Sequence, residues 1–256
     1  MSRKKVIVVM PAYNAEKTIE KTYQDIPRGL VDEIIVVDDA SRDRTIEIAQ
    51  RLGLTVIEHH NNVGYGGNQK TCYRHALAHG ADIIVMIHPD YQYDARLTYY
   101  MVDPIRKGFF DIMLGSRIRT RAEALAGGMP LYKYISNRFL TFVENIVLGQ
   151  NISDFHTGFR AYHRKVLETI PFESNSNGFV FDSEFLIQAI AFGFRIGEIP
   201  VPVRYMPEAS SINFTKSTIY GILTLWTLVK YVLFRLHLKE FPLFQPRKTD
   251  ACNTVK

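Results

Sequence analysis

Five short apolar runs alternate with helical patterns over the first half of the chain. The runs are continuous and rich in β-branched residues, as is typical of strands buried on both faces, and they lie at 6–10, 33–39, 55–59, 82–88 and 111–116. Helices are expected between them at about 16–25, 43–52, 68–79 and 96–107, with Asn14 capping the first and Ser41 or Asp43 capping the second. This alternation predicts an α/β fold with a mostly parallel sheet covered by helices on both faces.

The second half of the chain is less regular. Residues 118–131 predict a mobile loop, because they mix glycines and Pro130 with charges. Residues 132–148 predict a helix whose apolar side chains share one face, namely Ile135, Phe139, Phe142, Val143 and Ile146. The other predicted elements are an extended segment at 152–162, a helix at 182–192, an edge strand with prolines at 196–205 and a loose tail after Pro246.

An apolar segment at 217–244 resembles a membrane helix, but Lys230 interrupts it, and the uninterrupted run is too short to span about 30 Å of hydrocarbon. A narrow polar stripe follows one face at helical spacing: Lys216, Tyr220, Thr224, Thr227, Tyr231 and Arg235. The pattern therefore predicts an amphipathic helix that lies in a bilayer interface and is anchored by Trp226 and the flanking cations. The alternative is a helix packed on the rest of the chain or on a second copy in a homo-oligomer.

Composition narrows the class of protein. The chain has 256 residues, 46% hydrophobic and 22% charged, so it can bury its own core, and wholesale disorder and fibrous repeats are excluded. Cys72 and Cys252 are too few for a disulfide framework, which favours a reducing compartment. The basic start and short first apolar run predict a strand rather than a signal peptide. A formal charge of +5 suits phosphates or an anionic membrane, and no nucleic-acid partner is expected from it.

Polar residues that follow the predicted strands are the first candidates for a site, because ligands bind at the carboxyl ends of strands in such sheets. Asp90 and Gln92 follow the fourth strand, and oxygen ligands of this kind hold a hard divalent cation together with substrate phosphates. Turn and helix-cap roles for Asp90 and Asp94 are the structural alternative, which spacing alone favours. Ser116–Arg117 follows the fifth strand.

Asp38 and Asp39 end the second strand, where adjacent carboxylates can bind a base or the hydroxyls of a ribose. Capping of the next helix is the alternative role. The glycine-rich stretch 61–70 is not a Walker-type loop, and it predicts a tight strand–helix turn near a nucleotide.

Six segments together resemble the inverting family 2 glycosyltransferases, nearest to the dolichyl-phosphate mannosyltransferase and polyprenyl-phosphate glycosyltransferase branch. They read VVMPAYNAEKTI, IIVVDDASRDRT, NNVGYGGN, HPDYQYD, DFHTGFRAYHRKVL and GFVFDSEFLIQAIAFGFRIGEIPVPVRY, and they stand in the family's order over about residues 4–240. The resemblance implies a GT-A (Rossmann-like) fold over 1–212. Its parts would be a nucleotide-sugar half at about 1–117, an acceptor half at 118–212, a membrane-interface helix at 213–244 and a loose tail at 245–256.

The resemblance also implies roles for individual residues. The implied nucleotide-sugar site consists of Pro11, Ala12 and Tyr13 beside the base, Asp38 and Asp39 on base and ribose, and His88, Pro89, Asp90 and Gln92. Asp90, assisted by Gln92, would bind Mg²⁺ or Mn²⁺. Arg117 would reach the diphosphate or the acceptor, and the further cations implied for phosphate binding are Arg160, Arg204 and Lys216.

Two positions depart from the family pattern. The first Asp of the family's Asp–x–Asp signature is His88 here, so either Asp90 anchors the metal alone or His88 binds the diphosphate or the metal. Imidazole suits Mn²⁺ better than Mg²⁺. The third alternative is that His88 is a structural residue whose hydrogen bonds are satisfied within the core. The glutamate common after PAYN is Ala15, with Glu16 next, so no contact with the base is assigned there.

The acceptor decides the mechanism. Inverting transfer needs in-line attack on the anomeric carbon while a metal and arginines stabilise the leaving diphosphate. A lipid phosphate is already an anion, whereas a hydroxyl must lose its proton to a base, for which Asp182 and Glu184 are candidates unless they only place charge at a helix N-terminus. We expect polyprenyl phosphate as the acceptor on the cytoplasmic face of a membrane. A glycan hydroxyl acceptor and a non-catalytic nucleotide-sugar-binding protein are the alternatives.

Overall fold

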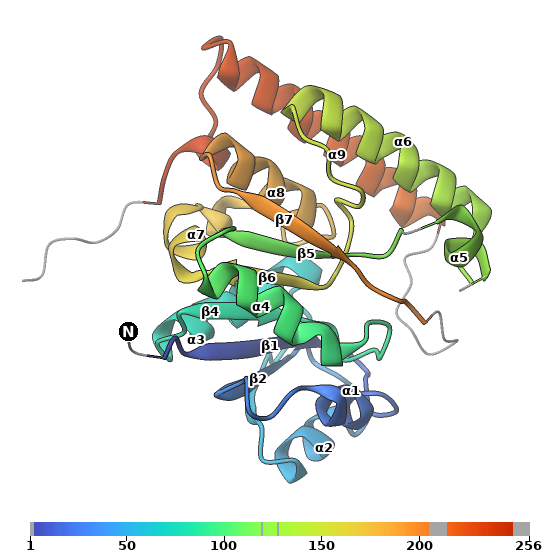
Figure 1. The fold of residues 1–256 in the computed structure, drawn as a ribbon, viewed down its shortest axis with the longest axis vertical. Coiled ribbons are helices and arrows are strands. Elements are labelled where there is room, and N and C mark those ends of the chain that lie inside the picture. Colours follow the sequence, from blue (N-terminus) through green and yellow to red (C-terminus); the bar gives the residue numbers. More distant parts are fainter. Residues whose placement is uncertain (1–2, 119, 127, 205–213, 248–256) are drawn as a thin grey trace, which may run out of the picture.

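The computed structural model describes residues 3–118, 120–126, 128–204 and 214–247. Within them, the centre is a seven-stranded sheet with the order β3-β2-β1-β4-β6-β5-β7 (Figure 1). The strands are β1 (Val6–Ala12), β2 (Glu33–Asp38), β3 (Thr55–Glu58), β4 (Ile83–Met86), β5 (Ile112–Ser116), β6 (Arg160–His163) and β7 (Ile196–Pro200).

The sheet is mostly parallel, as the sequence predicted, and one antiparallel strand makes it mixed. The strands β1 to β4 are parallel to one another, and β7 is parallel to β5, but β6 lies between β4 and β5 and is antiparallel to both. The alternation of the first half did not predict this, because β6 comes from residues far along the chain. The proline-containing segment does form an edge strand, β7, and Val203 beyond it bridges to Tyr93.

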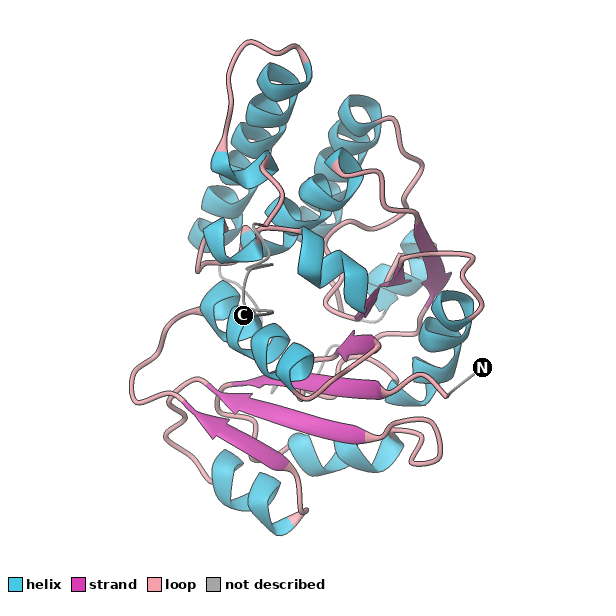
Figure 2. Ribbon diagram, turned by 90° about the vertical axis from the view of Figure 1, so that its left-hand side faces the viewer, coloured by secondary structure: helices cyan, strands magenta, loops and turns pink. Residues whose placement is uncertain are grey.

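Alternate strand residues fill two cores, one on each face of the sheet. Ile7 and Val9 point to the core shared with α3 (Tyr65–Ala78) and α8 (Phe181–Ala191). Val6 and Val8 point to the core shared with α1 (Ile19–Asp25), α2 (Thr45–Arg51) and α4 (Thr98–Arg106). Figure 2 shows helices on both sides of the strands. This two-sided burial explains why the strands read as continuous apolar runs.

The other helices belong mainly to the second half. They are α5 (Arg121–Ala126), α6 (Leu131–Leu148), α7 (Arg164–Thr169) and α9 (Phe214–Arg235), with short 3-10 helices η1 (Ala95–Leu97), η2 (Phe172–Ser174) and η3 (Pro242–Phe244). The helices α6 and α9 pack on each other, α9 also packs on α8, and the pair forms the side of the molecule opposite β2 and α2 (Figure 1).

Two of the predicted helix caps need correction. The cap residue of α1 is Thr18 rather than Asn14, because Asn14 adopts a left-handed backbone and accepts a hydrogen bond from the Arg42 amide. The cap residue of α2 is Arg44 rather than Ser41 or Asp43. Asp43 still accepts a bond from the Thr45 amide, whereas Ser41 bonds to the carboxylate of Asp38.

Several predicted boundaries were also wrong. The predicted loop 118–131 contains α5, and α3 begins at residue 65 rather than 68. Only residues 160–162 of the predicted extended segment 152–162 lie in a strand, β6, which continues to His163. The helix predicted at 217–244 ends at Arg235, and a short 3-10 turn follows at η3. The predictions for 205, 213 and 248–256 lie outside the described residues.

Candidate active site at the carboxyl edge of the sheet

Strained turns mark the carboxyl ends of three adjacent strands. Asn14, Ala40 and Tyr91 follow β1, β2 and β4, and they have φ angles of 50°, 62° and 58°. Residues with side chains rarely adopt this left-handed region, and such strain gathers where a site requires a particular loop shape. The structure therefore points to the same sheet edge as the sequence did.

Both carboxylates at the end of β2 bond within the protein. Asp38 accepts hydrogen bonds from the amide (2.8 Å) and hydroxyl (2.5 Å) of Ser41. Asp39 accepts from the amides of Val63 (2.8 Å) and Gly64 (3.1 Å), and its Oδ1 lies 2.9 Å from His59 Nδ1. These bonds shape the loop after β2 and the glycine-rich turn before α3. Contact of the two carboxylates with a base or ribose stays a prediction.

The end of β1 supplies one exposed aromatic side chain. Pro11 and Ala12 are buried within β1, whereas the next residue, Tyr13, is 53% exposed. Ala15 is buried, and Glu16 accepts a hydrogen bond from the Arg44 amide. Of the residues predicted to border the base, Tyr13 is therefore the one that offers an open surface.

The loop after β4 brings together the residues predicted to hold a metal. Asp90 Oδ1 accepts a hydrogen bond from the Gln92 amide (3.0 Å), which closes the strained turn at Tyr91, while Pro89 is buried behind it. The described residues contain no cluster of three or more His, Cys, Asp or Glu side chains. A carboxylate, an imidazole and an amide within five residues still fit a divalent cation that takes its other ligands from a nucleotide diphosphate.

Arg204 lies against this loop. Its amide donates to the carbonyl of Gln92 (3.0 Å), and its guanidinium stacks 4.5 Å from the centre of the Tyr91 ring. Nη2 is 3.7 Å from Asp94, which also pairs with Arg96. Nη1 is buried without a hydrogen-bond partner in the described part of the chain. A buried donor of this kind is costly unless a partner accepts from it. Contact of Arg204 with a phosphate stays a prediction.

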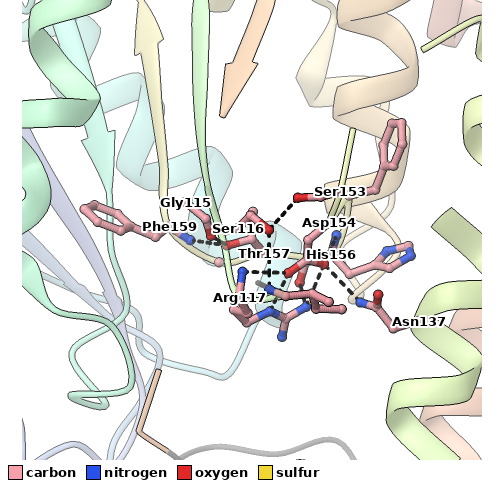
Figure 3. A network of polar contacts seen from close by, with 12 residues as sticks. Gly115, Ser116, Arg117, Asn137, Ser153, Asp154, His156, Thr157 and Phe159 are labelled. Atoms are coloured by element: carbon pink, nitrogen blue, oxygen red, sulfur yellow. Dashed lines mark hydrogen bonds and ion pairs between the residues drawn. The ribbon is translucent and has the colours of Figure 1, made fainter. Parts of the chain in front are cut away.

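Arg117 is fixed at the end of β5 by a buried carboxylate (Figure 3). It donates to Asp154 through Nε (2.8 Å) and Nη2 (3.1 Å), and to the carbonyl of His156 (2.6 Å). Burial alone would raise the pKa of Asp154, but Arg117 and Asn137 hold that pKa well below its usual range. The bidentate pair therefore presents the guanidinium in one orientation.

Arg160 needs correction as a phosphate ligand. Its side chain is fully buried and donates to the carbonyls of Thr157 (2.7 Å) and Phe155 (3.1 Å), and Nη1 lies 3.2 Å from Asp182 Oδ1. No face of the guanidinium reaches the surface in this arrangement. Arg160 is an internal counter-ion for Asp182.

The two carboxylates considered as bases are also engaged. Asp182 accepts from the Tyr65 hydroxyl (2.7 Å) and from Gln69 (3.1 Å) besides its pair with Arg160. Glu184 accepts from the Ser176 amide (2.7 Å), and burial raises its pKa. Both lie on the first turn of α8, as the sequence predicted, but neither is poised as a free base.

Three further residues of this region were not predicted from the sequence. Asp154 orients Arg117, Tyr65 links Asp182 to His88, and Gly158 leaves room for the His88 ring. Asp154 and Gly158 stand in the segment DFHTGF and Tyr65 in NNVGYGGN, so their motifs were visible. Their roles were not, because the partners are distant in sequence.

The helices α6 and α9 carry many large apolar side chains outward, whereas their inward faces mix polar and apolar side chains. The exposed set is Leu131, Tyr132, Ile135, Phe139, Phe142 and Ile146 on α6, and Ile219, Ile222, Leu223, Trp226, Val229 and Val232 on α9. Of the predicted polar stripe of α9, Thr224 and Thr227 are buried, and the Tyr220 hydroxyl lies 2.6 Å from His156 Nδ1. Lys216 is exposed on the first turn of α9. The outward faces of the two helices are therefore unusually apolar for helices that also pack on a core.

Solved structures of a glucosyl-3-phosphoglycerate synthase share this architecture. The match with glucosyl-3-phosphoglycerate synthase from Mycobacterium tuberculosis, in complex with UDP, covers 95% of this chain and 86% of that one, with a TM-score of 0.70 and 22% identity. Other structures of that synthase hold UDP with Mn²⁺ or with Mg²⁺. The mixed sheet with its flanking helices is therefore the GT-A-like fold of glycosyltransferases.

The sequence pattern of glycosyl transferase family 2 matches residues 7–171, and the chain belongs to this family of enzymes. An uncharacterised protein of Methanocaldococcus jannaschii is 30% identical over 234 residues, which are 91% of this chain and 95% of that protein. UDP-N-acetylglucosamine–dolichyl-phosphate N-acetylglucosaminyltransferase of Methanococcus voltae is 29% identical over 222 residues (80% and 88%). Dolichyl-phosphate hexose transferase of Haloferax volcanii is 32% identical over 200 residues (77% and 82%).

Proposed function

We propose that this glycosyltransferase moves a sugar from a GDP- or UDP-sugar to a polyprenyl phosphate, with inversion, while attached peripherally to the inner face of a membrane. The observation that carries the proposal is the outward apolar surface of α6 and α9, which adjoins the loop that holds Arg117. The relatives named for dolichyl-phosphate substrates support the same acceptor class.

A position along the membrane surface suits α9 better than a position across it. By length and composition, Thr215–Arg235 is the one helix of the described residues that could cross a membrane. Yet its inward face is bonded to the catalytic body, with Tyr220 on His156 and Thr224 3.1 Å from Ser183. The apolar side chains of α6 lie beside those of α9, so the lipid-facing surface would include both helices.

The engaged carboxylates favour a phosphate acceptor over a hydroxyl. A hydroxyl nucleophile requires a base, but Asp182 is paired with Arg160 and Glu184 accepts from a backbone amide. An ionised lipid phosphate needs no base. We propose that Arg117 and Lys216, which lie near the N-terminal ends of α6 and α9, attract that phosphate.

The donor would occupy the ends of β1, β2 and β4. Tyr13 would stack on the base, and Arg204 would donate to the diphosphate beside the turn at Asp90. A divalent cation held by Asp90 and Gln92 would neutralise charge on the leaving diphosphate. The acceptor phosphate would approach from the side of Arg117 and attack the anomeric carbon opposite the diphosphate.

The acceptor is tested by transfer of labelled sugar from UDP- and GDP-sugars, with Mn²⁺ or Mg²⁺, to dolichyl or undecaprenyl phosphate. The same lipids without phosphate are the matched control. We expect product with the phosphorylated lipids alone. Transfer to a glycan hydroxyl that is lost in Asp182→Asn or Glu184→Gln would overturn this proposal and favour the glycan acceptor.

The membrane surface is tested by co-sedimentation with vesicles that contain anionic lipid. Phe142 on α6 and Phe109 outside the helix pair are 62% and 63% exposed, so Phe142→Ser and Phe109→Ser remove equally exposed rings. Burying a phenylalanine in an apolar phase contributes roughly 1.5–3 kcal/mol, so Phe142→Ser should weaken binding at least about tenfold while Phe109→Ser should not. Equal binding by both variants would remove α6 from the membrane surface.

A further inference from the structure

The His88 ring is held in one orientation. Its Nε2 lies 3.0 Å from the Tyr65 hydroxyl, and the two rings stack with centroids 5.4 Å apart and planes 29° apart. On another side, a Cβ added to Gly158 would come within 2.7 Å of Cδ2 and 3.0 Å of Nε2. The Nε2 edge is therefore enclosed by Tyr65 and Gly158, and Nδ1 lies on the other edge of the ring.

The hydrogen bonds around Tyr65 determine which nitrogen of His88 carries the proton. Asp182 pairs with the buried Arg160 (3.2 Å) and accepts from Gln69, so it acts toward Tyr65 as an acceptor. The Tyr65 hydroxyl has a single proton, and it donates that proton to Asp182 Oδ2 (2.7 Å). The Tyr65 oxygen can then only accept from His88, which requires a proton on Nε2.

A neutral histidine protonated on Nε2 has a lone pair on Nδ1. None of the described residues contacts this nitrogen by a hydrogen bond or ion pair. His88 is the second residue after the end of β4, and Asp90 comes two residues later, at the turn that fits a divalent cation. Histidines that bind metals are commonly fixed in this way by an acceptor on their other nitrogen.

We propose that His88 binds the divalent cation of the donor site through Nδ1, with Tyr65 and Asp182 as positioning residues that fix its tautomer. A nitrogen ligand in place of a carboxylate removes one negative charge and favours Mn²⁺ over Mg²⁺. The proposal rests on the proposed function in one respect, because the remaining ligands come from a nucleotide diphosphate. It also assigns Asp182 a role other than that of a base.

The first test needs no variant. The full chain is mixed with MnCl₂ and either UDP or GDP, and the Mn²⁺ signal is recorded by pulsed electron paramagnetic resonance. We expect modulation from a directly bound ¹⁴N, replaced by ¹⁵N coupling when the protein carries ¹⁵N-labelled histidine. Bound Mn²⁺ that shows no histidine nitrogen coupling would overturn the proposal. Absence of nucleotide binding, measured separately by calorimetry, would instead contradict the proposed function.

Matched variants test the positioning residues. Tyr65→Phe keeps the ring stack and removes the hydroxyl that fixes His88. Tyr73→Phe, also on α3, removes a buried hydroxyl that donates to Gln69 (2.7 Å) and does not contact His88. Loss of such a supporting partner lowers metal affinity about 10- to 100-fold, so Tyr65→Phe should weaken Mn²⁺ binding by that factor and Tyr73→Phe should leave it unchanged. Equal effects would mean that Tyr65 acts on the fold alone.

His88→Asp tests the choice of metal. It restores the family's pair of carboxylates, so the ratio of Mg²⁺ to Mn²⁺ affinity, measured by competition in the presence of nucleotide, should rise at least about tenfold. The histidine coupling should disappear while Mn²⁺ still binds. An unchanged affinity ratio, or coupling that persists in this variant, would show that another histidine or no histidine binds the ion.

Discussion

Replacement of Arg160 by leucine should cost folding stability rather than substrate binding alone. The guanidinium is fully buried, donates to two backbone carbonyls and pairs with Asp182 at 3.2 Å. Arg160→Leu leaves the Asp182 carboxylate buried with only neutral donors from Tyr65 and Gln69. Loss of one partner of a buried ion pair costs about 3–5 kcal/mol in the free energy of unfolding. For a domain of this size each kcal/mol lowers Tm by roughly 2–4 °C, so a decrease of roughly 6–20 °C is expected.

Urea unfolding and calorimetry measure this change, with Arg51→Leu as the control. Arg51 also pairs with a carboxylate, Glu20, at 3.4 Å, but the two side chains are 60% and 45% exposed. Exposed pairs contribute about 0–1 kcal/mol, so this variant should melt close to the wild type. An Arg160→Leu protein that keeps the wild-type Tm and only loses binding of phosphorylated lipid would refute the reasoning and restore Arg160 as a phosphate ligand.

Three further predictions follow from single contacts. The folded protein lowers the pKa of Asp154, so the ionised carboxylate stabilises the fold above its unfolded pKa of about 3.9, and this stabilisation is lost as the pH falls from there toward the folded pKa. The Tm difference between wild type and Asp154→Asn should therefore shrink from pH 7 to pH 3. A constant Tm difference would contradict this prediction. Gly66→Ala should lower the free energy of unfolding in urea by about 1–3 kcal/mol, because the new Cβ would come within 2.7 Å of Phe181 Cβ and closer to the Ser176 carbonyl. Gly53→Ala is the control, because its new Cβ would meet no atom within 4 Å. Its left-handed backbone also destabilises the variant, but the packing around α8 should not change. Cys72 is fully buried, and burial raises the pKa of its thiol, so in a Cys252→Ser background a thiol reagent should label it only on unfolding; rapid native labelling would contradict the packing of α3.

The strands of the first half could be predicted because the pattern is local and β1, β4 and β5 are buried on both faces, although the edge strand β3 is only half-buried. The strand β6 could not, because its insertion between β4 and β5 is a non-local pairing of residues such as Ala161 with Val85 and Met113. The helix boundaries failed at strained turns such as Asn14, where contacts between loops override the local preference for a cap.

Some residues of the candidate site could likewise be predicted from the sequence, and others could not. Position after a strand was enough to predict Asp90, Gln92 and Arg117 at the carboxyl edge. Charge alone could not distinguish a surface cation from a buried counter-ion, so Arg160 was assigned wrongly. The apolar face of α6 was visible in the sequence, but its outward direction was not, since it depends on the buried Asn137, Thr141 and Glu144 on the opposite side of the helix.

The loop from Ser153 to Thr157 bonds to three separate parts of the molecule. Asp154 binds Arg117 and Asn137 of α6, and His156 binds Tyr220 of α9. On the proposed membrane orientation, these short rigid bonds set the height of the Arg117 guanidinium above the lipid plane. The distance between the active site and the membrane surface would then be fixed. The enzyme would select an acceptor partly by how far its head group extends from the bilayer, and not by its chemistry alone.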